Sequence, residues 1–128
     1  MAGRGDLEGP QARVTCPICE RGEPLAVVAE LPTSWVSTGI GAAPGYACVI
    51  YRRHVEEPYE LSAEEGSEYW GEVMLVARAL AEITRPQKMN YEIHGNTIPH
   101  LHTHLLPQSP AGEVDAVSLG EALRQALE

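Results

Sequence analysis

The first half of the chain predicts three β-strands from its pattern of apolar positions. Residues 25–31 (LAVVAEL) are rich in apolar and β-branched residues and stop at Pro32. Residues 34–38 (SWVST) predict a second strand one short turn later, and residues 46–53 (YACVIYRR) predict a third. The segment between these two strands, 39–45 (GIGAAPG), has the composition of a loop.

A long helix is predicted next, because the apolar residues now recur at spacings of three and four. Ser62 followed by Glu65 is a capping-box pattern for a helix start, and Pro86 ends the segment. The apolar stripe that this helix would turn toward a core comprises Tyr69, Val73, Val76, Leu80 and Ile83.

The last part of the chain predicts two more strands and a short helix. Residues 88–94 (KMNYEIH) alternate polar and apolar residues, residues 95–99 (GNTIP) have turn chemistry, and residues 100–106 (HLHTHLL) predict the final strand. Ser118 with Glu121 offers a capping box for a C-terminal helix. That helix would carry Leu119, Leu123 and Leu127.

This order of elements predicts the fold class. Short connections favour antiparallel pairing, and a helix that packs on one face of a sheet gives an α+β domain. We therefore predict an antiparallel five-stranded sheet with one long helix packed on it and a short C-terminal helix. Residues 1–13 are Gly-rich and charged, so we expect a flexible tail there and a single domain over residues 14–128.

The charge and composition of the chain restrict its partners. Nine Lys and Arg residues against 18 Asp and Glu residues give a formal net charge of −9, which argues against a surface that coats nucleic acid. A single nucleotide in a local pocket remains compatible with this charge. The start of the chain lacks the apolar stretch of a signal peptide, and no apolar run reaches the ~18 residues of a membrane span. We expect a cytoplasmic protein with no membrane partner.

Three of the five histidines fall within residues 99–107 (PHLHTHLLP), at every second position. Alternate side chains of a strand point the same way, so His100, His102 and His104 should share one face while Leu101 and its alternating neighbours face the long helix. Solvated histidines are one interpretation. A three-histidine zinc site is another, although same-face residues lie ~6.6 Å apart along a strand. We favour a nucleophilic pocket for an anion, with one of these histidines shared with a metal.

The preceding strand, predicted over residues 88–94, is expected to add side chains to both the core face and the histidine face. Across the turn, Met89, Tyr91 and Ile93 should join the core face, and cross-strand neighbours lie roughly 5 Å apart. The histidine face would then gain Asn90, Glu92 and His94.

A second group of candidate ligands lies near the start of the chain. Cys16 and Cys19 form a C-x-x-C pair, which is either half of a zinc site or a redox dithiol. A redox pair normally opens a helix after a strand in a βαβ unit, whereas this pair precedes the first strand, so we favour zinc. Two further ligands are needed, and the leading candidates are His54 and one of the three clustered histidines. Cys48 is interpreted as a small buried hydrophobic residue.

The segment HGNTIPHLHTHLLP resembles the signature of the histidine triad (HIT) superfamily, His-x-His-x-His-x-x with apolar x. The resemblance extends from about residue 16 to residue 107. It includes CPIC near the start, a strand that ends in RRH, the long helix and KMNYEIH before the turn. The two cysteines are similar to those of the zinc-containing, bacterial-type branch of the superfamily.

The resemblance implies a homodimer with one nucleotide site per subunit. It also implies an enzyme that hydrolyses or transfers nucleoside monophosphates from phosphoanhydrides, phosphoramidates or related esters, through a covalent nucleotidyl-histidine. By position, His102 would be the nucleophile and His104 would contact the phosphoryl oxygens. Asn96 and Thr97 would lie near the phosphate and the leaving group, and Asn90 on the preceding strand would help to bind substrate.

The resemblance further implies a structural zinc ion and leaves one histidine with two possible roles. The ligands of the zinc ion would be Cys16, Cys19, His54 and His100. His94 would be an additional phosphate contact or a spare zinc ligand.

Three positions depart from the family pattern. Gly45-Tyr46 replaces a Gly-His pair, Ser37-Thr38-Gly39 lacks the acid or Asn that holds ribose hydroxyls, and Pro107-Gln108 replaces Pro-Arg. The last change favours a small leaving group over a polyphosphate tail. The changes also keep an alternative function open, a non-catalytic nucleotide-binding or zinc-stabilised interaction protein. A zinc hydrolase is a weaker third hypothesis, because a Cys2His2 site has no open position for water.

Overall fold

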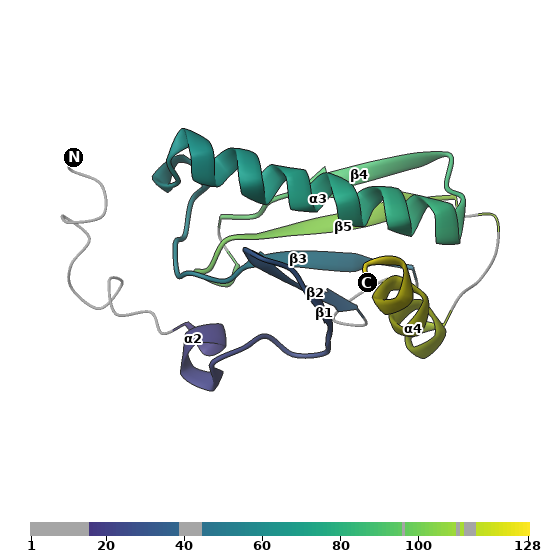
Figure 1. Cartoon of the computed structure of the whole chain (residues 1–128), viewed down its shortest axis with the longest axis horizontal. Helices are drawn as coiled ribbons and strands as arrows, with labels where there is room; N and C mark the ends of the chain where they lie inside the picture. Colours follow the sequence, from purple (N-terminus) through teal and green to yellow (C-terminus); the bar gives the residue numbers. More distant parts are fainter. Residues whose placement is uncertain (1–15, 39–44, 96, 110, 112–114) are drawn as a thin grey trace.

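A five-stranded sheet forms the centre of the computed structural model, which describes residues 16–38, 45–95, 97–109, 111 and 115–128 (Figure 1). The tail expected over residues 1–13 and nearly all of the loop expected over residues 39–45 lie outside these residues. The strands are β1 (Val27–Glu30), β2 (Ser34–Thr38), β3 (Ala47–Tyr51), β4 (Lys88–Glu92) and β5 (His102–Gln108). Their order is β1-β2-β3-β5-β4, and every neighbouring pair is antiparallel, as predicted.

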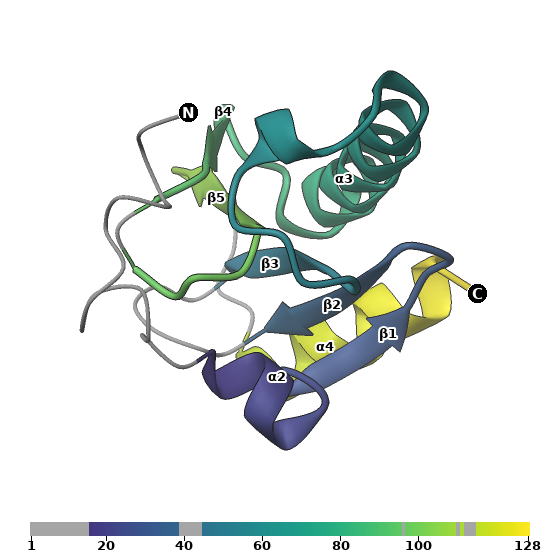
Figure 2. The same cartoon turned by 90° about the vertical axis from the view of Figure 1, so that its left-hand side faces the viewer.

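Two helices cover one face of this sheet. The long helix α3 (Ala63–Thr84) lies along the sheet, and the shorter α4 (Ala116–Ala126) lies beside it against β1 and β2 (Figures 1 and 2). The predicted capping box is present at the start of α3, where the Ser62 hydroxyl accepts the Glu65 N–H and the Glu65 carboxylate accepts the Ser62 N–H. Within the described residues, no helix combines the length and the apolar content that crossing a membrane requires.

The main core lies between the sheet and these two helices. Tyr69, Val73, Val76 and Leu80 of the predicted stripe are buried in it, whereas Ile83 at the end of the stripe is only partly buried. Because β3 is a central strand, it is buried on both faces. Its residues Ala47, Val49 and Tyr51 join the main core.

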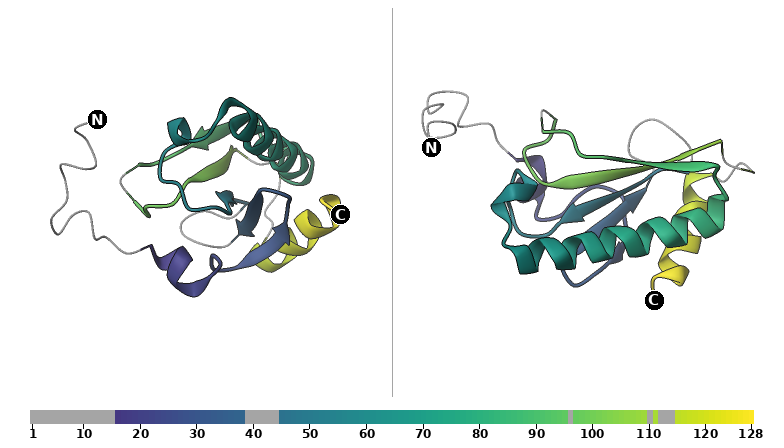
Figure 3. Two further views of the ribbon diagram at one scale, coloured as in Figure 1. Left: turned by 60° about the vertical axis from the view of Figure 1, so that its left-hand side comes forward. Right: turned by 90° about the horizontal axis from the view of Figure 1, so that it is seen from above.

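The other face of β3 contributes to a smaller apolar cluster. There Cys48 and Ile50 pack with Cys16 and Ile18 of the N-terminal segment, so the burial predicted for Cys48 is confirmed. This cluster lies on the side of the sheet opposite α3, where Figure 3 shows the N-terminal helix.

That helix, α2 (Pro17–Arg21), was not predicted from the sequence. Its five residues are too few to show a helical period, yet its ends carry standard helix signals. The Cys16 thiolate or thiol accepts the Cys19 N–H, Pro17 occupies the first turn, and Gly22 ends the helix with a left-handed φ of 87°. A second short helix, η2 (Pro58–Glu60), lies between β3 and α3.

The strands predicted over residues 25–31, 46–53 and 88–94 are shorter in the structure, and two further boundaries were wrong. The last strand, β5, begins at His102 and not at His100. The C-terminal helix is capped by Asp115, whose carboxylate accepts the Ser118 N–H at 2.9 Å, so Ser118 lies inside the first turn and is not the cap. Aspartate satisfies the free N–H groups of the first turn, and its charge suits that end of the helix.

Two residues predicted for the core face are exposed, Tyr91 and Ile93, and Ile93 lies just after the end of β4 and is 41% exposed. Tyr91 lies on the helix side of β4 and its ring is 6.2 Å from that of Trp70 on α3, but Tyr91 is 48% exposed. The reason is its place in the sheet, since β4 is an edge strand.

Candidate active site and metal cluster

The alternation of β5 places two of the three clustered histidines on the face opposite α3. Thr103, between them, faces the helix, where its hydroxyl lies 2.6 Å from the hydroxyl of Tyr69. His102 and His104 therefore point to the other side of the sheet, as predicted. Their rings are in contact, with centroids 4.9 Å apart.

His100 precedes β5 and takes a different direction. Its side chain is 1% exposed, and its Nε2 lies 2.6 Å from the backbone carbonyl of Tyr51. A carbonyl only accepts hydrogen bonds, so Nε2 carries the proton and Nδ1 keeps a free lone pair. Burial lowers the pKa of His100, which keeps the ring neutral, as a metal ligand must be.

That free Nδ1 lies in a cluster of four potential metal ligands. The ligand atoms of Cys16, Cys19, His54 and His100 all lie within 4.8 Å of one another. The Nδ1 of His100 is 3.4 Å from the Sγ of Cys16, 3.7 Å from the Sγ of Cys19 and 3.4 Å from the Nδ1 of His54.

These separations fit a single tetrahedral ion. With Zn–N bonds of about 2.05 Å and Zn–S bonds of about 2.3 Å, tetrahedral ligands lie about 3.3 Å apart for N···N and about 3.6 Å apart for S···N. The cluster therefore could hold one metal ion. The turn of α2 supplies both cysteines, while His54 follows β3 and His100 precedes β5.

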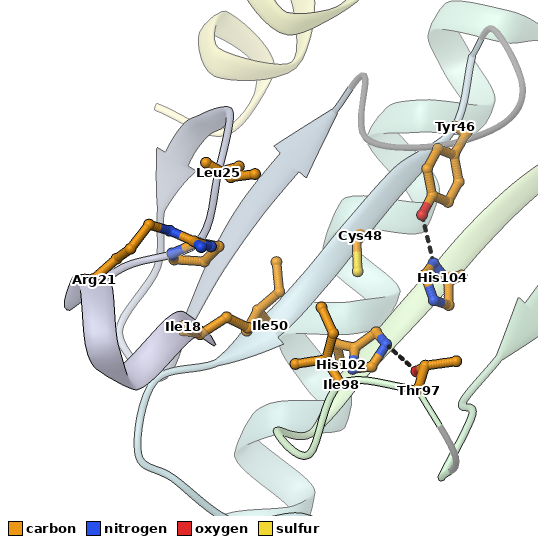
Figure 4. A pocket seen from close by; sticks show the side chains of 11 residues that line it. Ile18, Arg21, Leu25, Tyr46, Cys48, Ile50, Thr97, Ile98, His102 and His104 are labelled. Atoms are coloured by element: carbon orange, nitrogen blue, oxygen red, sulfur yellow. Dashed lines mark hydrogen bonds between the residues drawn. The ribbon is translucent and has the colours of Figure 1, made fainter. Parts of the chain in front are cut away.

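The partner of His102 leaves its other nitrogen free. The Nδ1 of His102 lies 2.6 Å from the carbonyl of His100, so Nδ1 carries the proton and Nε2 holds a lone pair. This Nε2 is 3.3 Å from the Thr97 hydroxyl, as Figure 4 shows. The predicted nucleophile and Thr97 thus come together.

A pocket of about 210 Å³ opens in front of these groups. His102, His104 and Thr97 line it, and Arg21 of α2 adds a cation to the lining (Figure 4). Its apolar lining comes from α2, the segment after α2, β3 and the turn before β5, and includes Ile18, Leu25, Ile50 and Ile98.

His104 meets a side chain that was not predicted as part of the site. Its Nδ1 lies 2.6 Å from the hydroxyl of Tyr46. Burial, followed by the neighbouring His102 and His94, lowers the pKa of His104. Burial also raises the pKa of Tyr46 to about 12, and that of the Cys48 thiol to about 12. All three groups are therefore neutral near pH 7.

The other predicted substrate-binding residues lie outside this pocket or outside the described residues. Asn90 is exposed on β4, opposite Leu106. His94 follows β4, binds the carboxylate of Glu92 at 3.0 Å and lies with its ring centroid 5.6 Å from that of His104. Asn96 lies outside the described residues.

Comparison with known proteins identifies the family of the chain. A family model described as the HIT domain matches residues 26–111.

The chain belongs to the HIT domain family. It is 30% identical over 74 residues to "Protein hit" of Bacillus subtilis (strain 168), which is 54% of this chain and 51% of that protein. This HIT protein therefore spans about half the length of that curated relative.

Solved HIT structures share the fold. A histidine triad protein from Bradyrhizobium japonicum matches with a TM-score of 0.70 and 26% identity, covering 80% of this chain and 90% of that one. A Zn-bound histidine triad family protein from Mycobacterium smegmatis matches with a TM-score of 0.71 and 21% identity, covering 88% and 93% of the two chains.

Three residues that line the pocket of this HIT protein were not predicted as part of the site, although the sequence contains a pattern that groups them. Tyr46, Cys48 and Ile50 alternate along the third strand, so they share a face. The pattern does not show which residues of the last strand lie opposite these three. Only the pairing of Cys48 with His104 and of Ile50 with His102 reveals that this face adjoins the histidines.

Proposed function

We propose that this HIT protein is an enzyme, a nucleotide hydrolase or nucleotidyltransferase that acts through a covalent nucleotidyl-histidine intermediate. The observation that carries the proposal is the state of His102. Its Nδ1–H is held by a carbonyl, and its Nε2 lone pair adjoins a pocket whose apolar side chains suit a base and whose polar groups suit a phosphate. Neutral imidazole in this state is a nucleophile.

In the proposed first step, Nε2 of His102 attacks the α-phosphorus of a bound nucleotide. The new N–P bond forms as the bond to the leaving group breaks, and the leaving group departs with the electron pair and takes up a proton. The imidazole becomes cationic, and its Nδ1–H bond to the His100 carbonyl stabilises that charge. Water or another acceptor then attacks phosphorus, gives up its proton and releases His102 with its lone pair restored.

The neighbouring polar groups are proposed to bind the phosphate. His104 lies beside His102 and would donate to a phosphoryl oxygen, while the Thr97 hydroxyl would lie near the leaving group. Asn96 is proposed on its sequence position alone. Asn90 and His94 are proposed as outer contacts, because His94 adjoins His104 but both lie beyond the pocket lining.

A single-turnover experiment tests the proposal. Protein in excess is mixed with α-³²P-labelled adenosine phosphoramidate, quenched and digested, and the label is sought on the peptide that contains His102. We expect label on wild-type protein and on His94→Ala, and none on His102→Ala. Adenosine and guanosine phosphoramidates and dinucleoside polyphosphates are compared in the same assay to define the base and the leaving group.

The absence of label from folded wild-type protein with every substrate of the panel would overturn the enzyme proposal. It would favour the alternative, a non-catalytic nucleotide-binding or zinc-stabilised interaction protein. In that case the His102→Ala variant should bind nucleotide with nearly unchanged affinity, which isothermal titration calorimetry measures.

We also propose that the metal of the Cys16–Cys19–His54–His100 cluster is zinc with a structural role. Two thiolates and two imidazoles are a donor set that zinc prefers, and four protein ligands leave no position for substrate. The Zn-bound relative from Mycobacterium smegmatis supports the choice of ion. When bound, the ion would cross-link α2 to the residues that follow β3 and precede β5.

Finally, we propose a homodimer formed along β4. This edge strand and the adjacent surface of α3 (Figure 1) expose large apolar side chains, among them Trp70, Met74 and Tyr91. An unpaired edge beside an apolar patch is a surface that a second chain can cover.

A further inference from the structure

The side chain of Tyr46 lies against His104 in a way that determines where the imidazole proton resides. The Tyr46 hydroxyl is 2.6 Å from Nδ1 of His104, and the two rings are nearly parallel, with centroids 5.5 Å apart and planes inclined by 16°. Figure 4 shows the hydroxyl pointing at the ring edge of His104 from the far end of the pocket. Tyr46 is 8% exposed, so water does not compete freely for this bond.

The direction of this hydrogen bond follows from counting donors and acceptors. A phenol has one proton to donate, and a neutral imidazole has one N–H and one lone pair. If Tyr46 donates to Nδ1, both groups are satisfied and the His104 proton is on Nε2. If Nδ1 carries the proton instead, the buried hydroxyl proton needs another acceptor, and among the described residues Nδ1 of His104 is the partner found for it.

We propose that Tyr46 is a positioning residue that keeps the proton of His104 on Nε2 and thereby presents an N–H donor beside the nucleophilic Nε2 of His102. This inference rests on the proposed function and extends it to a residue outside the triad. The donor would meet a phosphoryl oxygen of the nucleotide attacked by His102, where charge increases in the transition state.

A glycine and the pairing of β3 with β5 place Tyr46 next to His104. Gly45 has a left-handed φ of 83°, which favours glycine and turns the chain into β3. In β3, Cys48 lies directly opposite His104, so Tyr46 lies two residues further along the same face. Its hydroxyl then reaches back to the imidazole.

Each of the three clustered histidines thus has a different hydrogen-bond partner, and that partner determines which ring nitrogen carries the proton. Backbone carbonyls hold Nε2–H of His100 and Nδ1–H of His102, whereas a side-chain donor is available to His104. The tyrosine hydroxyl can donate to a lone pair, which a carbonyl cannot do. This difference explains why His102 and His104, on the same strand face, would present opposite states of Nε2 to the pocket.

The experiment compares wild-type protein with Tyr46→Phe, which keeps the ring and removes the hydroxyl. The ¹⁵N chemical shifts of the imidazole nitrogens report each tautomer directly at pH 7.5. We expect Nε2–H for His104 in wild-type protein and a mixture of tautomers in Tyr46→Phe, with His102 on Nδ1–H in both. Tyr69→Phe is the matched control, because Tyr69 is a buried tyrosine that bonds to Thr103 on the opposite face and should leave the His104 spectrum unchanged.

Steady-state kinetics provide a second measurement, because a purely structural role of Tyr46 would leave kcat and KM of the folded protein unchanged. We expect kcat of Tyr46→Phe to fall about 10-fold, the scale of one hydrogen bond, with KM little changed. Losing a donor that favours the neutral ring should also raise the pKa of His104, which its ¹⁵N chemical shifts over a pH series measure. Among the described residues, the titratable groups that face His104 are His102, Cys48, Tyr46, Glu92 and His94, and only Tyr46 is altered.

Two results would overturn the inference. One is a wild-type His104 with its proton on Nδ1, which the spectrum of wild-type protein alone reveals even if Tyr46→Phe does not fold. The other is a folded Tyr46→Phe whose His104 tautomer matches wild type. Because the nitrogen spectrum needs no substrate, a protein with the expected tautomers but no label on His102 would contradict the proposed enzyme activity and leave the role of Tyr46 in the proton position intact.

Discussion

At the scale of single residues, the hydrogen-bond partner of each imidazole decides which of its nitrogens is free. His100 and His102 are two residues apart, yet a carbonyl binds Nε2 of the first and Nδ1 of the second. The free nitrogen of His100 consequently faces two cysteines, and the free nitrogen of His102 faces the pocket. The same residue type can therefore serve structure and chemistry within one short segment.

This difference predicts that substitution of His100 lowers the metal content, whereas substitution of His102 lowers the turnover rate. His100→Ala should lower the zinc content and lower the midpoint of thermal unfolding by at least about 5 °C, because it removes a ligand from a buried cluster. His102→Ala should keep a full complement of zinc and reduce kcat at least about 10³-fold. Metal analysis of untagged protein, calorimetry and turnover assays measure these effects. Loss of zinc from His102→Ala to the same extent as from His100→Ala would contradict the assignment.

The pKa of His104 predicts how stability changes with pH. Burial and the adjacent His102 and His94 lower this pKa from the ordinary value of 6.5, so the unfolded chain binds the proton first as the pH falls. His104 therefore favours the folded state fully above pH 6.5 and less as the pH drops below it. Urea unfolding at pH 7.5 and pH 5.5 should show a larger loss of stability for wild type than for His104→Gln. An equal loss in the two proteins would show that His104 contributes nothing to this dependence.

At the scale of secondary-structure elements, the short helix α2 contributes to both the pocket and the metal cluster. The five residues of α2 bury Ile18 against β3 and place Arg21 in the pocket lining, and the residue that caps the helix, Cys16, is a potential metal ligand. A helix of this length is not stable by itself in water. Its position must therefore come from its tertiary contacts, including the metal cluster.

This dependence predicts that metal removal loosens α2 more than the rest of the protein. Treatment with a chelator should speed amide hydrogen exchange in residues 16–25 at least about 10-fold, because ligand binding supplies folding free energy to this segment. Exchange in α3 should change much less, since its core contacts involve no ligand of the cluster. Mass spectrometry of peptides from both helices makes the comparison within one sample. Uniform acceleration across α2 and α3 would indicate global unfolding and contradict the prediction.

The packing of α4 on β1 predicts opposite effects for two glycine substitutions. A Cβ on Gly120 would lie 2.9 Å from Cγ1 of Val28, a contact that the stiff valine can relieve only by moving, whereas nothing lies within 4 Å of a Cβ on Gly66 in α3. Gly120→Ala should therefore destabilise the protein by about 1 kcal/mol or more despite the better helix propensity of alanine. Gly66→Ala should stabilise it by up to about 1 kcal/mol. Chemical denaturation of both variants tests the contrast, and a stabilising Gly120→Ala would show that α4 packs less closely than described.

At the scale of the whole molecule, the two edges of the sheet are not equivalent. The β1 edge lies next to α4, whereas β4 lies at the margin of α3. Trp70 and Tyr91 meet there as partly exposed aromatic rings. Large apolar side chains at an uncovered sheet edge favour association.

The proposed dimer predicts that a charge on this surface separates the subunits. Trp70→Glu should raise the dissociation constant of the dimer about 30-fold or more, because buried aromatic anchors dominate interfaces. Val117→Glu on α4 is the matched control, since Val117 is also an exposed apolar residue but lies on the helix that packs against β1. Sedimentation equilibrium over a range of concentrations measures both variants. A wild-type protein that is monomeric at high micromolar concentration, or a dimer that Trp70→Glu leaves unchanged, would contradict the proposal.

The sequence by itself determined the order and type of the larger elements and suggested which residues to examine as a candidate site. The helix from residue 63 to residue 84 was predictable because its period and its Ser62–Glu65 cap are local properties. The opposite directions of Thr103 and its histidine neighbours followed from strand alternation, which is also local. The ligands of the metal cluster were predicted through a family resemblance, not through their spacing alone.

Only the tertiary structure decided how these groups are oriented. The proton of His100 depends on a carbonyl of Tyr51, 49 residues away, and that of His104 depends on Tyr46, 58 residues away. Register between β3 and β5 creates the second contact, and no local pattern encodes a register between distant strands. The helix α2 was not predicted for the same reason. Its five residues are too few to show a helical period in the sequence, and contacts with distant residues stabilise it.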